Sequence, residues 1–258
     1  MKLKQITFVL LTVSFAVFTS CKKEDSTPET ETSSSGEVEV NLEHKWGTLS
    51  SNFDLNTNLI HPVTNDTMNF TTMKYYISNL KLKKEDGTWW THPESYFLVD
   101  VSDPSSSKMV MKNVPAGIYT AMEYTFGVDS LRNVSGAQTG ALAIANGMFW
   151  TWNSGYIFLK AEGISPNSST DSYSFHLGGF KGLNNILKTS EFVFNSNSVD
   201  VVVSKGHTSE IHLNVFPDKL WNTVGSVSGT NTIHTPGADA KTMANDFAAG
   251  ILFDHVHN

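Results

Sequence analysis

Histidine is the side chain with the most open chemistry in this sequence. The chain of 258 residues holds nine histidines and one cysteine, Cys21, which ends an apolar leader. Without a second thiol, the folded part can form neither a disulfide nor a thiolate metal site. A bound metal must therefore use imidazole, thioether or carboxylate ligands. Copper best suits imidazoles with soft or aromatic neighbours, zinc is its rival, and spacing alone does not separate the two.

Three histidines are the candidate ligands for such a metal. His44 lies on the apolar side of an alternating segment, where a neutral imidazole needs a partner. His176 stands shortly before two glycines, which let the backbone turn closely around the ring. His92 follows Trp90 at a spacing that puts both rings on one side of an extended segment. We expect His176, His44 and His92 to come together from distant strands in one pocket.

The remaining histidines receive other interpretations. His212 alternates with apolar neighbours and is expected to face water. Three more lie in polar, turn-like surroundings: His61, His207 and His234. His255 and His257 form a pair two residues apart in the tail, where they could chelate a metal or merely decorate a terminus. With Asp254, this pair is also the basis of a third hypothesis, a cupin-like metalloenzyme.

The segment 147–156 concentrates large side chains between two glycines. Phe149, Trp150, Trp152 and Met148 fall within five positions. An ordinary edge loop has no packing reason for this, so the segment indicates a place where something is bound or buried. We expect Met148, Trp150 and Trp152 to wall the metal pocket. Met148 fits either a soft ligand or core filler.

The motifs of several enzyme classes are missing from the sequence. It contains no Gly-x-Ser-x-Gly elbow, no His-Glu-x-x-His helix and no phosphate-binding glycine motif. The net charge of −7 gives no basic footprint for nucleic acid. The sequence therefore favours a binding protein over an enzyme.

The first residues read as an export signal. Segment 1–21 has two lysines, an apolar run and small residues that end at Cys21. This ending resembles a bacterial lipobox, in which the cysteine is acylated. Residues 22–37 are polar and rich in Ser, Thr and Glu, which predicts a flexible tether. We expect residues 38–258 to form one domain, anchored in the cell envelope as an outer-membrane lipoprotein that faces the periplasm or the cell surface.

Apolar residues alternate with polar ones from residue 38 onward, and runs of β-branched and aromatic residues indicate further strands. The expected strands are 38–46, 74–84, 96–101, 109–114, 118–128, 156–161, 173–177, 192–203 and 210–215. We expect 109–114 to pair with 118–128 and 192–203 to form a hairpin with 210–215, and we expect loops at 52–69 and 129–146. A spacing of four predicts one helix at 239–253. The fold class is all-β, a β-sandwich or open barrel of many short antiparallel strands with long loops and one C-terminal helix.

Five ordered motifs carry a family resemblance. They are KYYISNL at 74–80, PAGIY at 115–119, the run that opens FGVDS at 126–136, GMFWTW at 147–152 and FHLGG at 175–179. Together they resemble the MbnP-like family of exported copper-binding proteins, over about residues 38–258. The resemblance implies a β-rich envelope protein that binds copper through histidines and, in some members, through a tryptophan oxidised to kynurenine.

The resemblance also implies partners and residue roles. The expected partners are a MauG-type diheme enzyme, an outer-membrane transporter and the membrane itself through the lipid anchor. Trp90 is the candidate modified tryptophan because similar proteins have a Trp-x-His pair in such a site. Trp46, Trp150 and Trp152 are its rivals. His176, in the best-matching motif, is the first expected ligand.

Two function classes follow from the sequence. The first is a non-enzymatic, lipid-anchored envelope protein that binds copper for acquisition or buffering. The alternative is a metal-free β-sandwich lipoprotein whose Trp and Tyr side chains bind glycans or peptides.

Overall fold

The computed structural model describes residues 34–136, 138–152, 155–194 and 199–258. Residues Ser33–Asn258 form one compact unit. The predicted leader, its lipobox Cys21 and residues 22–33 of the tether lie outside the described residues. The predicted tether is too long at its end, because residues 35–37 already belong to a strand. Among the described residues, no helix has the length and apolar character that a membrane span requires.

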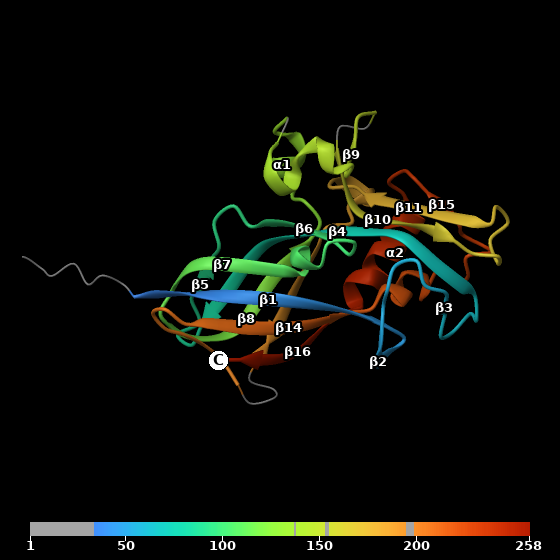
Figure 1. Ribbon diagram of the computed structural model, residues 1–258. Helices are drawn as coiled ribbons and strands as arrows, with labels where there is room; N and C mark the ends of the chain where they lie inside the picture. Colours follow the sequence, from blue (N-terminus) through green and yellow to red (C-terminus); the bar gives the residue numbers. More distant parts are fainter. Residues whose placement is uncertain (1–33, 137, 153–154, 195–198) are drawn as a thin grey trace, which may run out of the picture. The chain divides into compact units, whose positions relative to one another are not determined.

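The first of two sheets brings together the two ends of the domain (Figure 1). Its central strand β1 (Ser35–Trp46) pairs in parallel with β14 (Thr208–Val215) and antiparallel with β7 (Lys108–Pro115). β16 (Ile251–His257) pairs antiparallel with the other side of β14. β2 (Thr48–Asn52) folds back on the end of β1.

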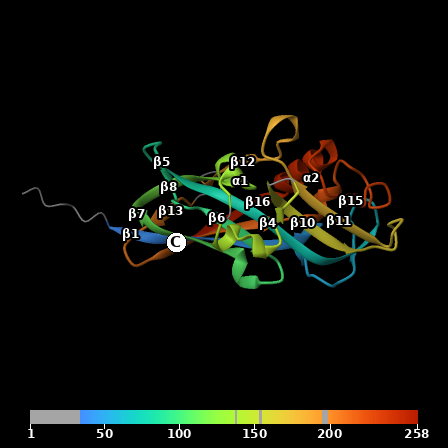
Figure 2. The same ribbon diagram turned by 90° about the horizontal axis from the view of Figure 1, so that it is seen from above.

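The second sheet is built along β4 (Thr67–Lys84), its longest strand. Figure 2 shows β8 (Gly117–Phe126) near one end of β4 and β10 (Gly155–Ile164) near the other. β12 (Lys188–Val193) continues the sheet beyond β8, and β11 (Ser172–Gly178) and β15 (Thr232–Ile233) continue it beyond β10. Shorter strands complete it: β3 (Leu59–Ile60), β5 (Trp89–Thr91), β6 (Tyr96–Asp100), β9 (Phe149–Trp150) and β13 (Val201–Val203).

One hydrophobic cluster takes side chains from both sheets and from the helix α2 (Ala238–Ala249). Phe247 of α2 lies 5.1 Å from Tyr75 and 5.6 Å from Phe126, measured between ring centroids. The helix thereby helps to close the core. A single helical turn, α1 (Ser130–Val134), and 3-10 turns occupy the connections: Pro104–Ser107, Gly140–Leu142, Ile144–Asn146, Gly182–Asn184 and Pro217–Trp221.

The predicted all-β class with one C-terminal helix is confirmed. Two predicted strand pairs are wrong. β7 pairs with β1 and β8 with β4, so the turn at 115–117 connects the two sheets rather than closing a hairpin. Likewise β13 pairs with β8, whereas β14 pairs with β1. Alternation reports which face of a strand is buried but not which strand lies beside it.

The predicted helix at 239–253 is too long, and the predicted loop at 52–69 contains β3 and the start of β4. α2 ends before Gly250, where a Cβ atom would lie 2.8 Å from the side chain of Lys219. The chain then turns, and residues 251–257 form β16. The spacing of four residues includes Ile251, which is why the predicted helix extends too far. In the structure Ile251 pairs with Val215 of β14.

Candidate metal centre

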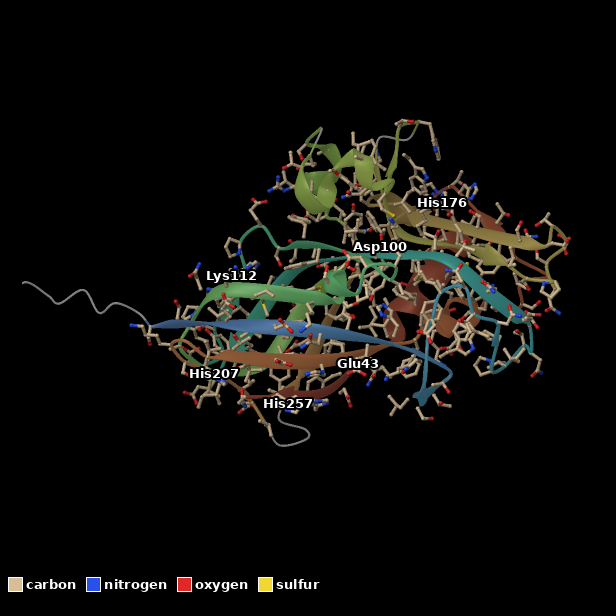
Figure 3. The ribbon with its side chains drawn as sticks, in the orientation of Figure 1. Glu43, Asp100, Lys112, His176, His207 and His257 are labelled. Carbon is tan, nitrogen blue, oxygen red and sulfur yellow. The ribbon has the colours of Figure 1, made fainter. Side chains whose placement is uncertain are left out.

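The outer face of the first sheet carries histidines from two neighbouring strands. On β14, the residues on either side of His212 are buried in the core, so His212 points outward. On β16, His255 lies directly opposite His212, and His257 lies opposite Glu210. Figure 3 shows His257 at this end of the chain and Glu43 on the same sheet.

A β-bulge puts both histidines of β16 on this face. The pairing with β14 skips Asp254, which is therefore an extra residue in β16. Phe253 and Val256 both pack against the core, although three positions separate them. In a regular strand, His255 would share the face of Phe253. The extra residue instead turns His255 and His257 outward.

His212, His255 and His257 together form what we call the three-histidine centre. Each offers a ring nitrogen, and these nitrogens all lie within 4.8 Å of one another. The rings of His212 and His255 stack with centroids 4.4 Å apart, and His257 stands edge-on at 4.6 Å from His255. The Nε2 atoms of His255 and His257 are 2.9 Å apart. A metal ion at about 2 Å from each nitrogen can bridge such a gap.

Carboxylates surround the three-histidine centre. Asp254 Oδ2 lies 2.9 Å from His255 Nδ1, Glu210 Oε2 lies 3.2 Å from His212 Nε2, and Glu43 Oε1 lies 3.7 Å from His212 Nδ1. When Nδ1–H of His255 donates to Asp254, the lone pair of Nε2 is left for a ligand. His212 Nδ1 is buried and has no hydrogen-bond partner in the described residues.

Partners hold two of these carboxylates in place. Asn41 Nδ2 donates to Glu210 Oε2 over 3.1 Å, and Lys45 Nζ lies 2.9 Å from Glu43 Oε2. The hydrogen bond from Lys45 holds the pKa of Glu43 below its usual range. Carboxylates beside imidazoles favour a cation at this face.

His176, the first ligand expected from the sequence, lies on the outer face of β11 in the second sheet. Its Nε2 lies 2.7 Å from Glu162 Oε1, and its ring stacks on that of His234 at 4.3 Å. His234 Nε2 lies 2.8 Å from Ser174 Oγ. Burial lowers the pKa of His176, and the hydrogen bond to Glu162 opposes this effect. The pair of imidazoles was not expected from the sequence.

His44 and His92 lie in two further environments. His44 Nε2 is 3.0 Å from the hydroxyl of Tyr75, and burial lowers the pKa of His44 to about 4. The ring of His92 lies 5.8 Å from that of Trp90, which confirms that the two share a side of the segment. His92 Nδ1 is buried without a hydrogen-bond partner among the described residues, and burial lowers the pKa of His92.

The structure does not bring His44, His92 and His176 together. They come from β1, from the end of β5 and from β11, and their side-chain partners are all different. Within the described ranges, the one group of three or more metal-ligating side chains is the three-histidine centre. The sequence pattern identified buried or half-buried imidazoles, but it could not tell that they belong to separate parts of the two sheets.

The aromatic segment divides between the core and a pocket. Trp150 and Trp152 line a cavity of about 390 Å³, together with Gly179 and Phe180. Met148 is fully buried in the core and does not line it. None of the histidines lines it either. The predicted wall therefore exists in part, but it encloses a pocket distinct from the three-histidine centre.

Comparison with known proteins now gives the family. The MbnP family model matches residues 35–236. The chain belongs to the MbnP family. A solved structure, MbnP from Methylosinus trichosporium, has the same fold at 15% identity and a TM-score of 0.51, covering 79% of this chain and 82% of that chain. A search among curated proteins found no match.

The match to MbnP separates the histidines into two sets. His44, His92, His176 and His212 lie within the matched residues, whereas both histidines of β16 lie beyond residue 236. The three-histidine centre thus combines a strand inside the matched segment with one outside it.

Sequence reasoning placed His212 in water and treated the tail pair as one of several alternatives. In the structure the side chain of His212 is only 16% exposed, and the ring of His255 stacks on it. Two features of the sequence pointed to this site, the outward face of His212 and the pair of histidines in the tail. The sequence does not show that they lie together, because this depends on the pairing of β14 with β16 and on the bulge at Asp254.

Proposed function

We propose that this protein binds a copper ion at the three-histidine centre and does so as a carrier or buffer rather than as an enzyme. The observation that carries this proposal is the group of three ring nitrogens within 4.8 Å on β14 and β16. Imidazoles are good ligands for copper, and the described residues contain no cysteine. The chain belongs to the MbnP family. The resemblance to that family implies copper, and this supports the choice of metal.

Zinc is the rival metal because it accepts the same ligands. Competition between the two ions decides the question. Purified protein should take up one copper ion per chain from a mixture of copper and zinc salts, and copper should displace bound zinc. Zinc that resists displacement by copper would leave the centre as a metal site but remove copper from the proposal.

Two variants locate the ion. A double variant, His255→Gln with His257→Gln, should lose the bound copper, whereas His207→Gln should keep it because His207 lies outside the centre. Glutamine retains polarity on the outer face, so the sheet should fold. Equal copper in the double variant and in the wild type would place the ion elsewhere.

Localisation belongs to the same proposal. An export signal and a lipid anchor at Cys21 would hold the domain in the cell envelope, at the periplasmic or outer surface. Mass spectrometry of protein from its native host should find acyl chains on Cys21, and Cys21→Ser should release the protein from membranes. Membrane-bound Cys21→Ser protein would rule out this anchor.

A modified tryptophan remains part of the proposal and is carried by Trp90. The indole of Trp90 lies 5.8 Å from the ring of His92. A MauG-type diheme enzyme, with peroxide or dioxygen as the oxidant, would cleave the C2–C3 bond of this indole, and loss of C2 as formate would leave the aromatic amine of kynurenine free to ligate a metal. An outer-membrane transporter would be the further partner. Peptide mapping should find kynurenine, a net gain of one oxygen with loss of one carbon, on the peptide with Trp90 and not on those with Trp46 or Trp152. Unmodified Trp90 in host-derived protein would contradict this part alone.

A further inference from the structure

The second sheet carries a pocket for which the proposed copper site has no use. It lies where the ends of β9 and β11 meet the turns that follow β11 and β15, and its volume is about 390 Å³. That volume is within the range of small-molecule sites. The three-histidine centre lies on the other sheet, so a ligand here would be separate from the metal.

Two glycines at the end of β11 let neighbouring groups approach the strand closely beside the pocket. A Cβ atom on Gly178 would lie 2.6 Å from the ring of Trp150, and one on Gly179 would lie 2.3 Å from the carbonyl oxygen of Asn184. Gly179 also has a φ of +134°. The indole and the turn at 182–184 can approach β11 this closely only because both positions lack side chains.

The aromatic rings form a stepped wall. Trp150 is 5% exposed and Trp152 is 62% exposed, and their rings lie 5.6 Å apart at an angle of 45°. Phe180 and Tyr156 complete this wall. A tryptophan that served only to fill the core would not leave most of its surface in water. An exposed indole beside a buried one instead offers an apolar face with a polar rim, which suits the C–H face of a sugar ring.

The polar side chains at the rim indicate the charge of the ligand. The lining includes Lys181 and no acidic residue, although the whole chain has a net charge of −7. The ammonium group of Lys181 lies 5.4 Å from the ring of Phe180 and has no carboxylate partner among the described residues. Asn184 and Thr235 are exposed at the same rim and can donate and accept hydrogen bonds. Charge complementarity therefore favours an anionic ligand.

We propose that this pocket binds a saccharide unit that carries a carboxylate. Trp152 stacks on the sugar ring, Trp150 forms the floor, and Lys181 pairs with the carboxylate. The amide of Asn184 and the hydroxyl of Thr235 contact the ring hydroxyls. This site is independent of copper.

The test compares an acidic and a neutral sugar of the same size. Saturation-transfer NMR and indole fluorescence are recorded on the full chain with a trimer of galacturonic acid and with galactotriose. The acidic trimer should bind, and the neutral trimer should bind at least about tenfold more weakly. No binding of the acidic trimer at millimolar concentration, or equal binding of both trimers, would overturn the proposal.

Three variants assign the contacts. Trp152→Ala should weaken binding of the acidic trimer by at least about tenfold, a typical effect of losing one aromatic contact. Trp89→Ala is the matched control, because Trp89 is 36% exposed on β5 and lies outside the pocket. Lys181→Gln should bring the acidic trimer to the affinity of the neutral one. Unchanged binding in Trp152→Ala or in Lys181→Gln would contradict the assignment. Variants of the three-histidine centre should bind the sugar like the wild type.

Discussion

His255 and His257 stand two residues apart on one strand with their Nε2 atoms 2.9 Å from each other. His212 of the neighbouring strand stacks on His255 and lies 5.2 Å from His257, measured between ring centroids. This triangle of imidazoles makes the outer face of the first sheet the candidate metal site. The carboxylate of Asp254 orients one of the rings.

Replacing Asp254 by Asn should weaken copper binding about tenfold, because the partner that orients His255 and raises its basicity is lost. Competitive titration against a chromophoric chelator measures the affinity. Asp239→Asn, on the first turn of α2, is the control and should bind copper like the wild type. A full affinity in Asp254→Asn would show that this carboxylate does not support the centre.

Deletion of Asp254 should leave His255 and His257 on the outer face. Because Asp254 is the extra residue of the bulge, its removal makes His255 follow Phe253 directly, in regular alternation and in the same register with β14. Copper should therefore still bind, about tenfold more weakly because the carboxylate beside His255 is lost. Circular dichroism checks that the deletion variant folds, and competitive titration measures its affinity. A folded deletion variant that binds no copper would show that the bulge itself is needed to position the ligands.

The stability of the fold should depend on pH through His44. Burial lowers its pKa to about 4, whereas an unfolded histidine has a pKa of about 6.5. The folded state thus binds fewer protons, so its stability is fully present above pH 6.5 and falls as pH decreases toward 4, by up to about 3 kcal/mol. Urea unfolding of the wild type and of His44→Gln measures the difference. The advantage of the wild type should shrink between pH 7 and pH 4.5, and a constant difference would contradict the burial of a neutral ring.

Gly178→Ala should destabilise the protein by about 1 to 3 kcal/mol, because the new methyl group would collide with the ring of Trp150. Thermal unfolding is the measurement, and indole fluorescence should report the displaced ring. Gly237→Ala is the matched control, since no atom lies within 4 Å of its Cβ position. Equal destabilisation by both substitutions would show that the close approach of Trp150 to β11 does not cause the loss of stability.

Hydrophobic alternation predicts much of this fold. It places the buried faces of β1, β4 and β8, because each depends on a few neighbouring residues. It fails where distant strands pair, as in the parallel contact of β1 with β14. The candidate site also depends on the pairing of distant strands. The face of His212 can be predicted locally, but its position opposite His255 depends on strand pairing and on one bulged residue.

X-ray absorption at the copper edge identifies the ligands of the bound ion. For protein loaded with one equivalent of copper, we expect scattering from about three imidazole rings with nitrogen at about 2.0 Å, a distance typical of metal-bound histidine. The signal should disappear in the double variant His255→Gln with His257→Gln and persist in His176→Gln. A wild-type spectrum with fewer than two imidazoles would contradict the assignment of copper to this face. A spectrum that stays unchanged in the double variant but changes in His176→Gln would contradict it as well.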